Sequence, residues 1–142
     1  MAQGYFNQKS DIKGLGIKSV SAGISADDGE KVSKMAVNVM DKLYGIDISS
    51  HRSKSVNEKD VDEAVLILTM SRMHKNLLVS NFPEHHEKIF TLSEYVLESD
   101  ALHIPEDIKD PYMSDEYTYT KVAKEIAFYI DKLIDCLSEN EL

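Results

Sequence analysis

The sequence has few of the features that secreted or membrane proteins show. Its single cysteine, Cys136, cannot form an internal disulfide. Its longest apolar run, Ala64–Leu68, is far shorter than the roughly 20 residues that cross a bilayer as a helix. Its first residues also lack the charged-then-apolar pattern of a secretion signal. We therefore expect a cytoplasmic protein in a reducing environment, with no membrane partner.

Basic residues are also scarce. Sixteen Lys and Arg residues stand against 25 Asp and Glu residues, which gives a formal net charge of −9. This balance opposes nonspecific attraction to nucleic acid or anionic lipid, so we expect no nucleic-acid partner. An anionic substrate is still compatible with it, because backbone N–H groups at a helix N-terminus can bind a phosphate.

The apolar residues predict a single α/β domain over residues 1–142. The continuous apolar run Val65–Met70 is typical of a parallel strand covered on both faces. A helical stripe from Val32 to Leu43 precedes it and ends at Gly45, which is a usual helix stop. Further helices are expected at 1–13, 71–82, 93–97 and from a Ser114 cap to the C-terminus, and further strands at Ile17–Ser21 and Lys88–Leu92, with a loop at Ser99–Tyr112. Strands that alternate with helices favour a parallel, doubly wound sheet.

Several short motifs occur in a specific order. The chain contains Ser21-Ala22-Gly23, then His51-Arg52-Ser53, then Phe90-Thr91-Leu92-Ser93-Glu94-Tyr95, and finally Asp110-Pro111-Tyr112. Each motif alone is weak, but the ordered set resembles the low-molecular-weight protein-tyrosine phosphatase family, including its protein-arginine phosphatase branch. The resemblance implies a three-layer α/β fold of the phosphotyrosine phosphatase I type and a phosphorylated protein as the partner, with no cofactor.

Members of this family carry a Cys-x5-Arg-Ser phosphate loop directly after a central first strand. Here Met1-Ala2 resembles the start of the helix beyond that loop, and Cys136 lies near the C-terminus. The resemblance therefore implies that the first strand, the nucleophile and the clamp arginine are absent from the chain as written, which would be inactive in this form. We expect the natural protein to extend upstream. A chain that truly starts at Met1 would have unpaired strand edges and could borrow a strand as a homo-oligomer.

The resemblance also assigns roles to particular residues. Asp110 matches the general acid, which protonates the leaving group, although Asp-Pro is also a common turn. Tyr112 would form a pocket wall. Ser21 and His51 match the pair that braces the phosphate loop, while the alternative is a histidine and a serine that are bonded locally.

The choice of substrate depends on residues 26 and 27. Ala26 and Asp27 occupy a place where many relatives carry a large aromatic residue. A small residue beside a carboxylate resembles the arginine-phosphatase branch, because a carboxylate can bind a guanidinium group. A solvated acidic loop is an equally good interpretation, so phosphotyrosine and phosphoarginine both stay open.

Two other functions are compatible with the sequence. One is a non-catalytic phosphatase-like binding module, and the other is an arsenate reductase, which would need further redox cysteines. Cys136 is interpreted as a packing residue on the last helix. The histidines at 74, 85, 86 and 103 lack the spacing of metal ligands, so we expect no metal site and treat them as surface residues.

Overall fold

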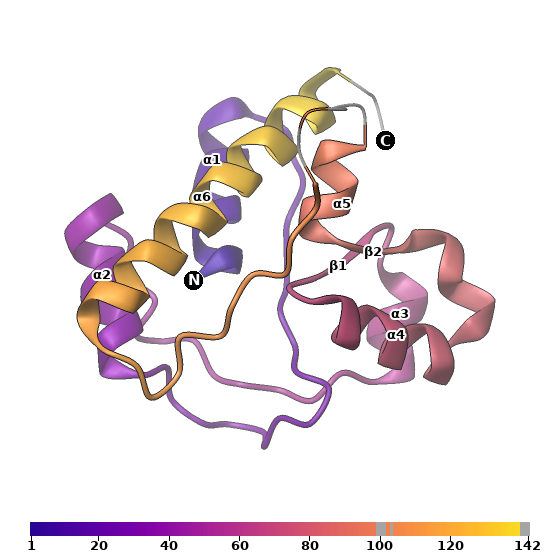
Figure 1. Cartoon of the computed structure of the whole chain (residues 1–142), viewed down its shortest axis with the longest axis horizontal. Coiled ribbons are helices and arrows are strands. Elements are labelled where there is room, and N and C mark those ends of the chain that lie inside the picture. The colour runs from indigo at the N-terminus through magenta and orange to yellow at the C-terminus, as the bar shows by residue number, and fades with distance from the viewer. Residues whose placement is uncertain (99–101, 103, 140–142) are drawn as a thin grey trace.

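The computed structural model describes residues 1–98, 102 and 104–139, and it shows an α/β fold with a parallel sheet (Figure 1). The two described strands are β1 (Ile67–Thr69) and β2 (Ile89–Thr91). The helices are α1 (Ala2–Lys13), α2 (Lys34–Tyr44), α3 (Glu58–Glu63), α4 (Arg72–Asn81), η1 (Pro83–Lys88), α5 (Leu92–Leu97) and α6 (Glu116–Glu139). The predicted loop Ser99–Tyr112 falls in part on residues 99–101 and 103, which lie outside the described residues.

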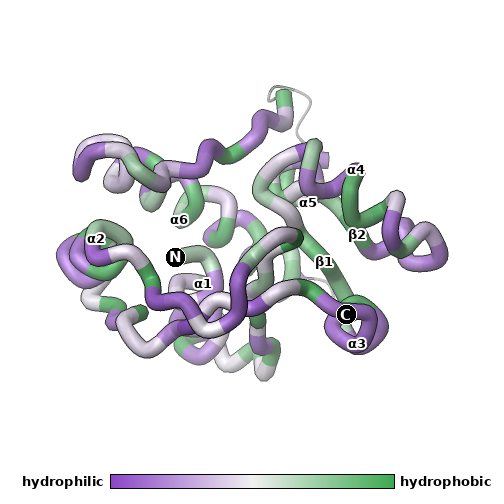
Figure 2. Tube along the Cα trace, turned by 90° about the horizontal axis from the view of Figure 1, so that it is seen from below, coloured by the Kyte–Doolittle hydropathy of each residue, from purple (hydrophilic) through white to green (hydrophobic). Residues whose placement is uncertain are grey.

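The sheet follows the predicted pattern of a strand, a helical crossover and a parallel strand. Ile67 lies opposite Ile89 and Thr69 opposite Thr91, with α4 and η1 as the connection. Both strands are hydrophobic parts of the chain (Figure 2). Each predicted strand is shorter than expected, and Val65 is 74% exposed. The expectation that the run Val65–Met70 is covered on both faces along its whole length was therefore wrong.

Helix α6 organises the larger part of the core. It packs against α1, α2 and α5, and Figure 1 shows it lying across α1 and α2. The predicted apolar stripe of this helix is confirmed, because every one of its members is buried: Val122, Ile126, Ile130, Leu133, Ile134 and Leu137. The phenol of Tyr5 on α1 adds a polar link, since it donates to the Asp131 carboxylate at 3.1 Å.

The ends of the helices are set by local chemistry. Gly45 ends α2 in the left-handed conformation with φ 63°, as the sequence predicted. The predicted cap of the last helix was wrong by one residue. Asp115 rather than Ser114 accepts the Thr118 backbone N–H at 2.9 Å, so Asp115 is the residue that caps α6.

The segment Ile17–Ser21 is extended but forms no strand, in contrast to the prediction. A strand is defined by backbone pairing, and this segment is held to α1 by a side chain instead. Asn7 Oδ1 accepts the Ser19 N–H at 2.8 Å, and Asn7 Nδ2 donates to the Ser19 carbonyl at 3.1 Å. These two hydrogen bonds hold the segment against α1 in one position. Ser21, two residues further along, therefore lies near the start of that helix.

Two histidines predicted to lie on the surface have defined partners. His85 is largely covered, with 23% of its side chain exposed, and its Nε2 lies 2.8 Å from Asp62 Oδ1. His86 Nδ1 lies 2.9 Å from the Pro83 carbonyl oxygen. His103 lies outside the described residues. Among the residues that the structure describes, no three His, Cys, Asp or Glu side chains gather as metal ligands would.

Candidate functional site

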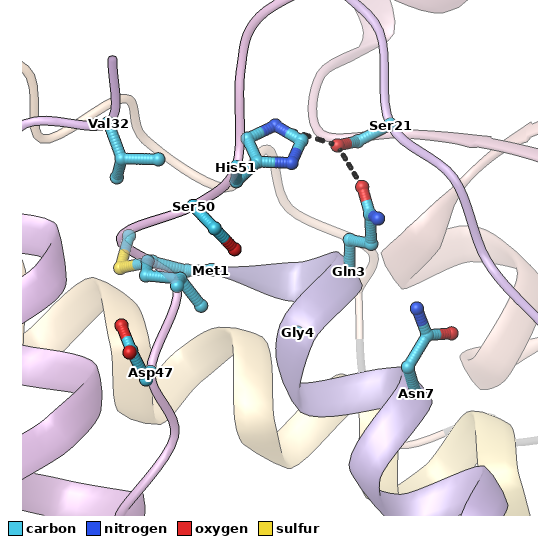
Figure 3. Close-up of a pocket in the computed structure, with 10 residues that line it drawn as sticks. Met1, Gln3, Gly4, Asn7, Ser21, Val32, Asp47, Ser50 and His51 are labelled. Atoms are coloured by element: carbon cyan, nitrogen blue, oxygen red, sulfur yellow. Dashed lines mark hydrogen bonds between the residues drawn. The ribbon is translucent and has the colours of Figure 1, made fainter.

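A pocket of about 240 Å³ opens at the N-terminal end of α1. It is lined by Met1, Gln3, Gly4, Asn7, Ser21, Val32, Asp47, Ile48, Ser50 and His51. Figure 3 shows that these residues come from α1, from the extended segment that ends at Ser21, from the segment before α2 that carries Val32, and from the connection after α2. The pocket therefore combines four separate parts of the chain at a helix N-terminus, where backbone N–H groups favour an anion.

Ser21 is the centre of the polar contacts in this pocket. Its hydroxyl donates to Gln3 Oε1 at 2.6 Å, and its Oγ lies 3.5 Å from His51 Nε2 (Figure 3). A neutral imidazole with its proton on Nε2 can donate to Ser21 Oγ while the serine hydroxyl donates to Gln3. The two residues that the sequence predicted as a brace are thus neighbours.

His51 is held in place through its backbone and through Arg52. Its N–H donates to the Ile48 carbonyl at 3.2 Å, and Arg52 Nη1 donates to its carbonyl at 2.9 Å. Burial lowers the pKa of His51, and the positive charges of the Met1 amino group and Arg52 lower it further. The neutral ring is therefore favoured at a site next to a helix N-terminus.

The acidic loop that contains Ala26 and Asp27 is attached to the segment after His51. The Gly23 N–H donates to the Lys54 carbonyl at 2.9 Å, and the Ser53 hydroxyl donates to the Asp27 carbonyl at 2.5 Å. A Cβ on Gly23 would lie 2.7 Å from the Ala26 Cβ, so these two small residues are in close contact. Position 23 therefore has no room for a side chain while Ala26 occupies this place in the loop.

Asp110 lies in a turn that is held in place by a backbone hydrogen bond at the end of the sheet. The Ile108 N–H donates to the Met70 carbonyl at 2.9 Å, just after β1, and Pro111 is buried. Asp110 Oδ1 then accepts the Tyr112 N–H at 3.0 Å, which fixes the carboxyl group in an Asx turn. Asp110 itself is exposed, and the Tyr112 side chain is 68% exposed.

The structure brings together only part of the predicted site. Ser21 and His51 line one pocket, whereas Asp110, Tyr112, Ala26 and Asp27 are not among the residues that line it. Sequence reasoning missed Gln3 and Asn7, which lie one helical turn apart on one face of α1. The available signal was the spacing of Gln3 and Asn7, which puts two polar side chains on one face of the predicted helix that precedes the Ser21-Ala22-Gly23 motif. Cys136 lies in the last turns of α6 and does not line this pocket.

Comparison with known proteins identifies the family. The model of the low molecular weight phosphotyrosine protein phosphatase family matches residues 1–142, so the chain belongs to this family. No helix within the described part of the chain has the length and apolar character needed to cross a membrane.

Three relatives define the branches to which the chain is similar. A protein-arginine-phosphatase of Geobacillus stearothermophilus is 32% identical over 126 residues, which cover 89% of this chain and 80% of the relative. A solved low molecular weight protein tyrosine phosphatase from T. tengcongensis is 45% identical, with a TM-score of 0.88 over 96% of this chain and 88% of that one. A YwlE arginine phosphatase, solved as a cysteine-to-serine mutant with a phosphorylated active-site serine, gives a TM-score of 0.91 at 26% identity, over 99% of this chain and 88% of that one.

Proposed function

We propose that residues 1–142 provide the general acid and the anion-binding side of a phosphatase that hydrolyses phosphorylated protein side chains. The observation that carries the proposal is the Ser21–His51 contact, 3.5 Å long, at the N-terminal end of α1 in a chain of this family. A helix N-terminus attracts a phosphate, and a serine and a histidine beside it can hold a phosphate-binding loop through hydrogen bonds.

The proposed reaction has two steps. A cysteine thiolate attacks phosphorus, the bond to the leaving oxygen or nitrogen breaks, and the carboxylic acid of Asp110 protonates the leaving atom. Water then attacks the phosphocysteine, the Asp110 carboxylate accepts a proton from it, and the thiolate and inorganic phosphate are released. A reducing compartment such as the cytoplasm suits this chemistry, because the thiolate must stay reduced.

The thiolate in this proposal does not come from Cys136. That residue lies on α6, outside the lining of the pocket that contains Ser21 and His51. That a Cys-x5-Arg-Ser loop is encoded upstream of Met1 stays a prediction. The intact mass of the protein made by its own cell tests it, because a product of 16.0 kDa would leave no room for such a loop.

The substrate is proposed to be phosphoarginine or phosphotyrosine. The similarity to a protein-arginine-phosphatase and the pairing of small Ala26 with exposed Asp27 support phosphoarginine. The higher sequence identity to the tyrosine phosphatase from T. tengcongensis, 45%, supports phosphotyrosine. Phosphate release from the two phosphoamino acids, compared for the native protein and Asp27→Asn, separates them. A loss confined to phosphoarginine would assign Asp27 to binding of the guanidinium group.

Asp110→Asn in the native protein tests the whole proposal. We expect kcat for an aryl phosphate to fall by a factor of about 10² to 10⁴, which is the usual contribution of a general acid. Asp135→Asn, the same change on the exposed face of α6, serves as the control and should leave kcat unchanged. A chain of residues 1–142 alone should release no phosphate. Thiol-dependent turnover by that chain, or full activity of Asp110→Asn, would overturn the assignment.

A further inference from the structure

A second depression, of about 290 Å³, adjoins the pocket that contains Ser21 and His51. It is lined by Lys31, Val32, Lys34, Val37, Asn38 and Ser49. Val32 lines both hollows, and Ser49 of the second is followed directly by Ser50 and His51 of the first. A ligand that extends from the first pocket across Val32 therefore enters the second depression, which we call the lysine pocket.

The charge of the lysine pocket is opposite to that of the chain as a whole. Two of its six lining residues are lysines and none is acidic, although the net charge of the chain is −9. Arg52 adds a third positive charge beside it. Lys31 and Arg52 form a backbone bridge, and Arg52 Nη1 donates to the Ser49 carbonyl at 3.0 Å.

The start of α2 reinforces this charge. Lys34 is the first residue of the helix, and Ser33 caps it by accepting the Ala36 N–H at 3.2 Å. The helix dipole then adds partial positive charge at the same place. Lys31 and Lys34 are both exposed, so their ammonium groups can reach a ligand. Val32 and Val37 provide an apolar surface against which the stem of a flexible side chain can pack.

We propose that the lysine pocket binds the carboxylate of an Asp or Glu residue that flanks the phosphorylated residue of a substrate protein. This inference rests on the proposed function, since the flanking position is defined by a phosphorylated residue at the pocket of Ser21 and His51. Lysine binds a carboxylate as a point charge without strict geometry, which suits recognition of an acidic stretch rather than of one fixed group. The pocket therefore sets a preference for acidic sequence around the target residue.

Binding of four fluorescein-labelled peptides, followed by anisotropy at low salt, tests the proposal on the protein as its own cell makes it, with Asp110→Asn introduced throughout to slow hydrolysis of the phosphopeptides. The peptides combine a phosphorylated or unphosphorylated target residue with flanking Glu or flanking Lys residues. We expect the Glu-flanked phosphopeptide to bind about five-fold more tightly than the Lys-flanked one, because exposed ion pairs have modest effects and are screened by salt. The double variant Lys31→Glu/Lys34→Glu should lose this difference or invert it.

The variants are chosen so that misfolding does not imitate the result. Glu at position 34 is compatible with the start of α2, because an acidic residue in the first turn is favourable to the helix dipole. Lys121→Glu/Lys124→Glu, two exposed positions of α6, is the charge-matched control and should retain the preference for flanking Glu. Circular dichroism of all three proteins should show the same helical content.

The two proposals fail in different ways. Equal affinity for Glu-flanked and Lys-flanked peptides, or a preference that survives Lys31→Glu/Lys34→Glu, would overturn the lysine pocket. A preference that Lys121→Glu/Lys124→Glu also abolishes would overturn it too, because the effect would then come from net charge. An affinity that does not depend on phosphorylation would instead contradict the proposed function, while the effect of the flanking charge would still report on the lysine pocket.

Discussion

The phenol of Tyr5 donates to the carboxylate of Asp131 at 3.1 Å, across 126 positions of the sequence. Tyr5 is only 4% exposed, so this hydroxyl reaches the edge of the contact between α1 and α6 from a buried ring. The link matters for the site because α1 presents Gln3 and Asn7 to the pocket, and the packing of α1 on α6 fixes where its N-terminal end lies.

Tyr5→Phe should lower the free energy of unfolding by about 1 kcal/mol, because it removes one hydrogen bond and keeps the ring. Urea denaturation measures the change. Tyr117→Phe is the matched control, since Tyr117 is 76% exposed, and it should have no measurable effect. Equal stability of Tyr5→Phe and the native chain would show that the Asp131 contact contributes nothing.

Gly23→Ala should destabilise the loop that carries Ala26 and Asp27. The added Cβ would lie 2.7 Å from the Ala26 Cβ, and such overpacking costs about 1–3 kcal/mol. Thermal unfolding should show a lower midpoint. The double variant Gly23→Ala/Ala26→Gly moves the methyl group to the other side of the contact and should recover most of the loss. Without recovery, the clash with Ala26 would not be the cause.

Met113 has a positive φ of 66°, which is unfavourable for a residue with a side chain, and its side chain is 86% exposed. Met113→Gly should keep or raise the stability by up to about 1 kcal/mol, since glycine adopts this conformation without steric penalty. Met113→Ile should instead lower it by about 1–2 kcal/mol, because a branched Cβ worsens the same conformation. A scanning calorimeter measures both, and the same sign for the two variants would contradict the argument.

The stability of the chain should fall as the pH is lowered from about 7 to 5, partly because of His51. Burial lowers the pKa of His51 in the folded state below its ordinary value of about 6.5, so the unfolded state binds the proton more tightly. The loss begins as the pH falls through the unfolded pKa and is complete below the lowered folded pKa.

Urea denaturation at about pH 7.5 and about pH 5.5, on either side of the ordinary histidine pKa, measures this difference in the free energy of unfolding. His51→Gln should reduce it, whereas His86→Gln, which changes a histidine of η1 outside the pocket, should leave it as in the native chain. A difference that His51→Gln does not alter would show that other groups cause the acid sensitivity.

The amino-acid sequence by itself determined the elements whose signals are local. The buried stripe of α6 follows from a helical spacing of apolar residues, and α2 ends at Gly45 because glycine adopts the left-handed conformation easily. The order of motifs from Ser21-Ala22-Gly23 to Asp110-Pro111-Tyr112 was enough to predict the phosphatase family, which the match over residues 1–142 confirms.

Only the tertiary structure decided which residues meet. Ile17–Ser21 has the composition of a strand, yet it forms none in the described chain, because a strand requires a backbone partner and a side chain of α1 takes that place. In the same way, the choice of Asp115 over Ser114 as the α6 cap depends on where the chain enters the helix.

The pockets show the same limit. Gln3 joins Ser21 and His51 through contacts between distant positions, and the lysine pocket combines the start of α2 with the segment before His51. Periodicity and capping act over a few residues, so they can be read along the chain. Contacts between distant positions depend on how whole helices and segments pack, and that packing is a property of the complete fold.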